Sequence, residues 1–129
     1  MSEHAHPPHP PGDGLDAGTR GKLGALETIK DLSPVHAKAK ADRVHIELFR
    51  KSKKALLMIE AERDHGMKSA AMQERYAYAH PDYIALLDGL HAAVEAEERL
   101  RFQLMAAEAA IRIWQTRMAS DRIERQTIR

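Results

Sequence analysis

The sequence predicts an all-α fold, an elongated antiparallel helical hairpin or coiled coil with a short connecting helix and a disordered N-terminal tail. Aromatic residues make up only 5% of the 129 residues and charged residues 30%, a composition typical of long helices that pack along a stripe. Apolar residues recur at alternating spacings of three and four through most of the second half, as in a coiled-coil seam. Most of the prolines and glycines precede residue 25.

Residues 1–33 are predicted to form a flexible tail. Their prolines and glycines leave too little apolar surface to offset the entropy lost on ordering. The tail also contains three histidines that could hold a metal weakly, but a flexible chain gives them no fixed ligand geometry. We therefore expect a solvated tail around His4, His6 and His9.

A first helix is expected over residues 34–65. Ser33 suits the N-cap, and Pro34 suits the first helical position, where its missing N–H would be unpaired anyway. Gly66 suits the position after the helix, because glycine adopts positive φ without penalty. The expected core residues of this helix are Ala41, Val44, Leu48, Ala55, Leu56 and Ile59.

A short second helix is expected over 70–79, capped by Ser69, and a third over 82–124. Pro81 separates them, because it disfavours helical geometry at the preceding residue. Asp82 then places a negative charge in the first turn, where it favours the helix dipole.

The third helix contains the clearest pattern in the sequence, an apolar repeat that runs for about five heptads. Its positions are Tyr83, Leu86, Leu90, Ala93, Glu97, Leu100, Leu104, Ala107, Ile111, Trp114, Met118 and Asp121. We expect the packing or oligomer seam to consist of Leu86, Leu90, Leu100, Leu104, Ile111, Trp114 and Met118.

The expected lengths predict a hairpin with a further partner. At 1.5 Å per residue the third helix would be about 64 Å long and the first about 48 Å. The first helix, folded back antiparallel, would cover only part of the seam, so a second copy is expected to cover the rest. The sequence thus predicts a homo-oligomer.

Charge supports the antiparallel orientation. Residues 38–54 contain seven Lys or Arg and two acids, while residues 82–98 contain five acids and no Lys or Arg. Glu97 is the charged residue within the stripe. It could fix the register or oligomer state, but we expect it to lie at the edge and pair with Arg50 or Lys51.

No motif for catalysis or cofactor binding is found. His80 and Asp82 could form an acid–base pair, but no nucleophile accompanies them, and a structural helix–proline–helix corner is expected. The group Glu60, Glu62, Asp64 and His65 includes one Glu-x-x-His, whereas bundle di-metal sites need two. Neither a phosphate-binding loop nor a zinc-protease motif occurs. We therefore expect no enzyme activity, no cofactor, no metal and no small-molecule substrate.

The C-terminal arginines are candidates for nucleic-acid contact, since they could follow a phosphate backbone. They are Arg112, Arg117, Arg122 and Arg125, followed by Arg129. Arginine near a helix C-terminus is also expected from the dipole alone. Trp114 could stack on a base, but its place in the seam favours a core role.

The second half resembles a recurrent type of small phage or prophage protein. The resemblance covers residues 52–125 and is carried by Tyr76-Ala-Tyr78-Ala-His80-Pro81-Asp82-Tyr83, an Ala/Glu/Leu-rich helix, and Ile113-Trp114-Gln115-Thr116 with Ala119 and Arg122. Such proteins accompany recombination or replication genes, so the resemblance implies an accessory role in DNA metabolism. Gln115 stands where an Arg would be expected, which weakens the case for a basic contact there.

These observations predict a non-enzymatic, self-associating accessory protein that binds DNA or a DNA-handling partner. The alternative is a protein-interaction module, such as a scaffold, chaperone or inhibitor, without nucleic-acid binding. The absence of cysteine and of any apolar run of about 18 residues favours a cytoplasmic protein with no membrane contact.

Overall fold

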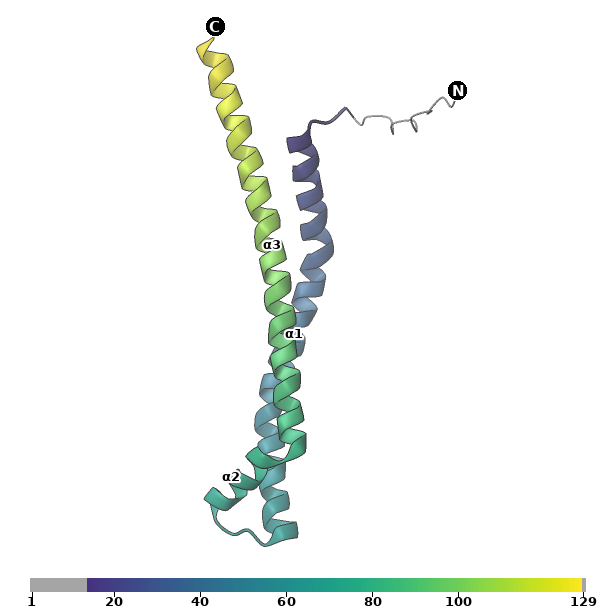
Figure 1. The fold of residues 1–129 in the computed structure, drawn as a ribbon, viewed down its shortest axis with the longest axis vertical. Coiled ribbons are helices and arrows are strands. Elements are labelled where there is room, and N and C mark those ends of the chain that lie inside the picture. Colours follow the sequence, from purple (N-terminus) through teal and green to yellow (C-terminus); the bar gives the residue numbers. More distant parts are fainter. Residues whose placement is uncertain (1–13, 129) are drawn as a thin grey trace, which may run out of the picture.

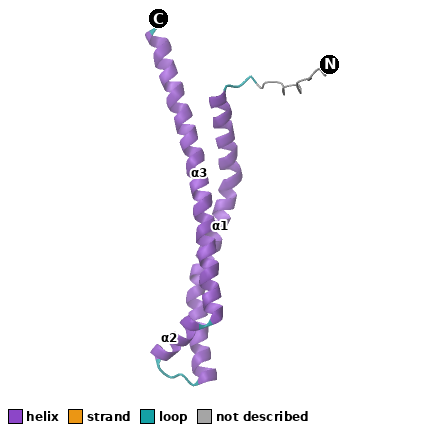
Figure 2. Cartoon of the chain, viewed as in Figure 1, coloured by secondary structure: helices purple, strands orange, loops and turns teal. Residues whose placement is uncertain are grey.

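The computed structural model describes residues 14–128, and within them the order of elements is α1 (Ala17–His65), α2 (Ala70–Ala79) and α3 (Pro81–Thr127). The two long helices lie side by side and antiparallel, and α2 lies at the end where the chain turns back (Figure 1). The chain in this range is helical apart from short connections (Figure 2). The predicted all-α helical hairpin is confirmed.

The start of α1 differs from the prediction by about five turns. Asp16 is the N-cap, and its Oδ1 accepts a hydrogen bond from the backbone N–H of Thr19 at 2.6 Å. Ser33 and Pro34 lie inside the helix, and the Ser33 hydroxyl donates to the Ile29 carbonyl at 2.5 Å. The predicted tail of residues 1–33 is therefore wrong from residue 17 onward; residues 1–13, with His4, His6 and His9, lie outside the described range.

Packing against α3 explains why the helix continues through Pro34. A proline inside a helix costs about 3 kcal/mol, but residues 17–33 bury apolar surface along the C-terminal half of α3. Ala25 is buried, and a Cβ at Gly18 would lie 3.7 Å from Cδ1 of Trp114. Local capping preferences identified a helix start at Ser33, but tertiary contact decided the boundary.

The other predicted boundaries agree closely with the structure. Gly66 follows α1 with φ of 64°, as predicted for that position. Ser69 caps α2 by accepting from the backbone N–H of Met72 at 3.2 Å. Pro81 occupies the first turn of α3, which ends three residues beyond the predicted 124. The His80 side chain, not assigned a capping role from sequence, accepts from the Asp82 N–H at 3.0 Å.

The apolar repeat of α3 faces α1 over its whole predicted length. Every repeat position from Tyr83 to Met118 is buried or half-buried, and Asp121 is exposed. However, α1 and α3 have 49 and 47 residues, so α1 lies along nearly all of the stripe. The inference that unmatched length requires a second copy was therefore wrong, because it rested on a first helix that began too late.

The face that α1 turns toward α3 is not the predicted one. All six predicted core residues of α1 are exposed, including Leu48, Leu56 and Ile59. The residues that face α3 instead form a repeat of mixed polarity: Gly18, Lys22, Ala25, Ile29, Leu32, His36, Ala39, Arg43, Ile46, Arg50, Lys53 and Leu57. Long basic side chains can cover an apolar stripe with their methylene stems while their charged ends reach water.

The apolar core is thin. Its main cluster lies at the closed end of the hairpin, where Leu57, Ala77 and Tyr83 are buried and Met58 packs against them. Among the described residues no large side chain is fully buried. The hairpin therefore has little apolar burial of its own with which to offset the entropy of ordering two long helices.

Candidate interaction surfaces

A charged pair lies in the middle of the contact between α1 and α3. Arg43 donates to both oxygens of Glu97, through Nε and, at 3.3 Å, through Nη2. Its Nη1 also donates to Glu47 at 2.9 Å. Glu97 is only 8% exposed, and the hydrogen bonds from Arg43 hold its pKa below the ordinary value. Glu97 thus pairs across the hairpin, but inside the seam and with Arg43 in place of the predicted Arg50 or Lys51.

A second polar cluster joins α1, α2 and α3 at the closed end. The Tyr76 hydroxyl donates to Glu60 at 3.0 Å and lies 3.2 Å from Nε2 of His65. Nε2 of His80 lies 3.7 Å from the same Glu60 carboxylate. Burial, followed by the hydrogen bond to Glu60, raises the pKa of Tyr76. These contacts hold α2 against α1, which agrees with the structural role expected for the corner.

The acidic and histidine side chains of this end are not arranged as a set of metal ligands. Within residues 14–128 no group of three or more His, Asp or Glu side chains is placed to hold a metal ion. Asp64 pairs with the neighbouring Arg63, and Glu62 is exposed. Nδ1 of His80 accepts the hydrogen bond from the Asp82 N–H that caps α3, so this nitrogen is not available as a metal ligand.

The candidate nucleic-acid residues lie on an exposed stretch of α3. Arg112, Arg117, Arg122 and Arg125 are all exposed, and none forms an ion pair within the described part of the chain. The last turns of α3 extend beyond the start of α1 (Figure 1). Trp114 is half-buried, with the Lys22 ammonium 3.9 Å from its ring centroid, so it packs in the seam, as expected, and is not free to stack on a base.

Exposed apolar side chains form a ridge on α1. We define the α1 ridge as Leu48, Phe49, Leu56 and Ile59, which are 63%, 42%, 57% and 55% exposed. Leu56 follows Phe49 by seven residues and Leu48 by eight, and Ile59 follows Leu48 by eleven, so the four side chains lie on one side of the helix. Sequence reasoning found three of these residues but placed them in the core. The sequence of α1 contains two repeats with alternating spacings of three and four residues, one on the face toward α3 and one on the exposed face. Only the contact with α3 shows which repeat is the inner one.

Beside the ridge, α3 presents small side chains. Phe49 and Lys53 of α1 and Asp82, Ala85 and Leu86 of α3 line an open groove of about 400 Å³.

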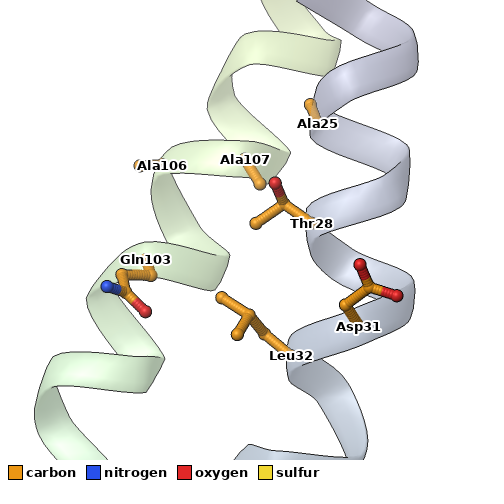
Figure 3. A pocket seen from close by; sticks show the side chains of 7 residues that line it. All are labelled: Ala25, Thr28, Asp31, Leu32, Gln103, Ala106 and Ala107. Carbon is orange, nitrogen blue, oxygen red and sulfur yellow. The ribbon is translucent and has the colours of Figure 1, made fainter.

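A wider groove, of about 580 Å³, lies further along the same contact, between Ala25, Thr28, Asp31 and Leu32 of α1 and Gln103, Ala106 and Ala107 of α3. In Figure 3, Thr28 and Leu32 point from α1 toward α3, whose alanines leave the space open. The Thr28 hydroxyl in the wider groove donates to the backbone carbonyl of Gly24 at 3.0 Å and has no hydrogen bond to Asp31 in the described part of the chain.

Comparison of the chain with protein-family models, with curated proteins and with solved structures found no match. None of the helices in residues 14–128 combines the length and apolar character needed to cross a membrane. The fold is therefore established by its own helices, and function has to be inferred from the surfaces described above.

Proposed function

We propose that the chain is a non-enzymatic helical accessory protein that works by self-association. The observation that carries this proposal is the α1 ridge, together with further exposed apolar residues on α3 such as Ile84 and Phe102, 47% and 58% exposed. Exposed apolar residues that lie together on one side of a helix are typical of protein–protein interaction sites. The seam of α3 does not provide this association, because α1 covers it.

A second candidate function is DNA binding by the arginines at the end of α3. It is favoured by the exposure of Arg112, Arg117, Arg122 and Arg125 and by the absence of ion pairs to them among the described residues. The resemblance to small phage proteins of DNA metabolism also supports a DNA-binding function. A cytoplasmic location belongs to this proposal, as does the absence of a small-molecule substrate. The alternative is an interaction module that binds a different protein and no nucleic acid.

The test is the mass of the full chain in solution, measured by sedimentation over a hundredfold range of concentration, with and without a short DNA duplex. Self-association predicts a mass above the 14.5 kDa of one chain that rises with concentration. DNA binding predicts a further complex that dissociates as salt is raised. A chain that stays monomeric throughout would overturn self-association and favour the interaction module.

A further inference from the structure

We infer that the α1 ridge is the docking surface for the α1 ridge of a second copy of this chain, with the two α1 helices antiparallel. The inference rests on the self-association proposed above and specifies its face, direction and register. The two-fold axis would cross α1 at a right angle between residues 53 and 54. Each copy would then present α1 to its partner and carry its own α3 on the far side.

The ridge faces away from the rest of the chain. Lys53 pairs with Asp82 of α3 at 3.6 Å, and Lys54 bonds to Glu74 of α2 at 3.3 Å. Because successive side chains of a helix are about 100° apart, Ser52 lies across α1 from Lys54. The outer repeat that includes the ridge consists of exposed residues spaced alternately by three and four: His45, Leu48, Ser52, Ala55, Ile59 and Glu62. A second copy can therefore approach this face without displacing α2 or α3.

The spacing of the outer repeat makes it complementary to itself. An axis between residues 53 and 54 sets two residues level when they lie equally far from it. Leu48 is then level with the partner's Ile59, and Ser52 with the partner's Ala55. Large apolar side chains meet large ones on both sides of the axis, while the small side chains at the centre let the two helices approach closely.

One flank of the ridge adds a second apolar contact. Phe49 and Leu56 lie on this flank, and a two-fold axis of this kind brings the flank of each copy against the same flank of the other. Their distances from the axis differ by two residues, or about 3 Å along the helix, so Phe49 can pack on the partner's Leu56. All four residues of the ridge thus gain an apolar neighbour.

Other registers of the same antiparallel pairing are less favourable. A shift of one heptad in one direction sets Leu48 against the partner's Ser52, and the opposite shift sets Ile59 against the partner's Ala55. Each shift loses both contacts between Leu48 and Ile59. The positions of the large side chains therefore favour one register.

Charge favours the antiparallel direction. Asp42 and Arg63 continue the flank of Phe49 and Leu56 at spacings of seven, and the proposed axis brings Asp42 of each copy near the partner's Arg63. Both side chains remain largely exposed, 56% and 71%, beside neighbours of opposite charge in their own chain. A parallel pairing would set each of these charges against the same charge of the other copy, which is unfavourable.

Sedimentation of full-chain variants tests the surface. Leu48→Glu introduces a charge into the ridge and should weaken dimerisation at least about thirtyfold, with helicity unchanged because the site is exposed. Ile123→Glu is the matched control: both positions are 63% exposed, but Ile123 lies on α3 outside the ridge. Its mass should equal that of the wild type.

Mixtures of variants test the direction and register. Ile59→Lys should weaken the dimer as Leu48→Glu does, but an equimolar mixture of the two should associate more tightly than either alone. In the mixed dimer the two introduced charges face each other on one side of the axis, and the natural Leu48–Ile59 contact remains on the other. A mixture of Leu48→Glu with Leu48→Lys is the control, because these positions do not meet in the antiparallel pair and association should not recover.

The outcomes separate the parts of the proposal. Recovery in the Leu48→Glu and Leu48→Lys mixture, without recovery in the mixture with Ile59→Lys, would overturn the antiparallel direction. A wild-type dimer unaffected by Leu48→Glu and by Ile59→Lys would overturn the docking surface alone. A wild type that is monomeric at every concentration would overturn self-association as well.

Discussion

Arg43 on α1 and Glu97 on α3 are 54 residues apart in sequence and joined by two hydrogen bonds in the middle of the hairpin. The pair replaces an apolar layer of the seam with a specific polar contact. Buried polar groups at seam positions can select one register and exclude others. Here the contact fixes how far α1 slides along α3.

Removal of one partner of this pair should destabilise the hairpin. Glu97→Ala leaves the Arg43 guanidinium in the contact without its carboxylate partner across the hairpin, and the unfolding temperature should fall. The double variant Arg43→Met/Glu97→Leu should be more stable than Glu97→Ala, because apolar residues of similar volume can replace such a pair. Thermal unfolding followed by circular dichroism at one protein concentration measures both. A double variant less stable than the single one would contradict this interpretation.

Acid should weaken the same contact over a defined range of pH. The pKa of Glu97 is lowered in the folded chain, so its carboxylate stabilises the fold fully above the ordinary value of 4.5, and this is lost as pH falls through the lower folded value. The difference in urea midpoint between wild type and Glu97→Gln should therefore be constant near neutral pH and shrink below about pH 4.5. A difference that persists unchanged at pH 2 would show that the carboxylate charge is not responsible.

The thin core at the closed end should be sensitive to truncation. Leu57 is 4% exposed, and Leu57→Ala should cost about 2 to 4 kcal/mol of unfolding free energy. Ile123→Ala, at a site 63% exposed, should change it by no more than about 0.5 kcal/mol. Equal losses at the two sites would mean that Leu57 does not anchor the core.

Pro34 should be a weak point in α1. A proline inside a helix cannot donate the backbone hydrogen bond to the residue four earlier, so Pro34→Ala should raise the unfolding free energy by about 1 to 3 kcal/mol. Pro81 in the first turn of α3 is the comparison, because a backbone N–H at that position would have no helical carbonyl to bond. Pro81→Ala should therefore give no such gain. A loss of stability in Pro34→Ala would indicate that the proline shapes α1 for its contact with α3.

The DNA-binding hypothesis predicts a measurable change in salt dependence. If Arg117 contacts phosphate, Arg117→Ala should reduce the slope of log K against log salt by about one. Lys68→Ala, an exposed cation at the closed end, should leave the slope unchanged. Binding that is absent in the wild type, or insensitive to salt, would leave the protein-interaction module as the better hypothesis.

The repeat of α3 could be read from sequence because its apolar residues occur on one face only. The same reasoning failed on α1, where Leu48, Leu56 and Ile59 form an outer repeat and Leu57 lies on the inner one. Apolar character alone predicts that the outer repeat packs against α3. The inner repeat packs there instead, and its basic residues complement the charge of the acidic stretch of α3. The start of α1 was missed for a related reason. Ser33 and Pro34 satisfy the local preferences for the N-cap and the first helical position, and contact of residues 17–33 with the part of α3 near Trp114 overrides them.

The single tryptophan of the chain stands between Gly18 and Lys22 at the open end of the hairpin, while all three tyrosines lie at the closed end. Indole and phenol emission therefore report on opposite ends of one molecule. If the hairpin opens like a zipper when it is heated, Trp114 fluorescence should change before the tyrosine signal does. The natural sequence thus contains the two optical probes needed to see in which direction the helices separate.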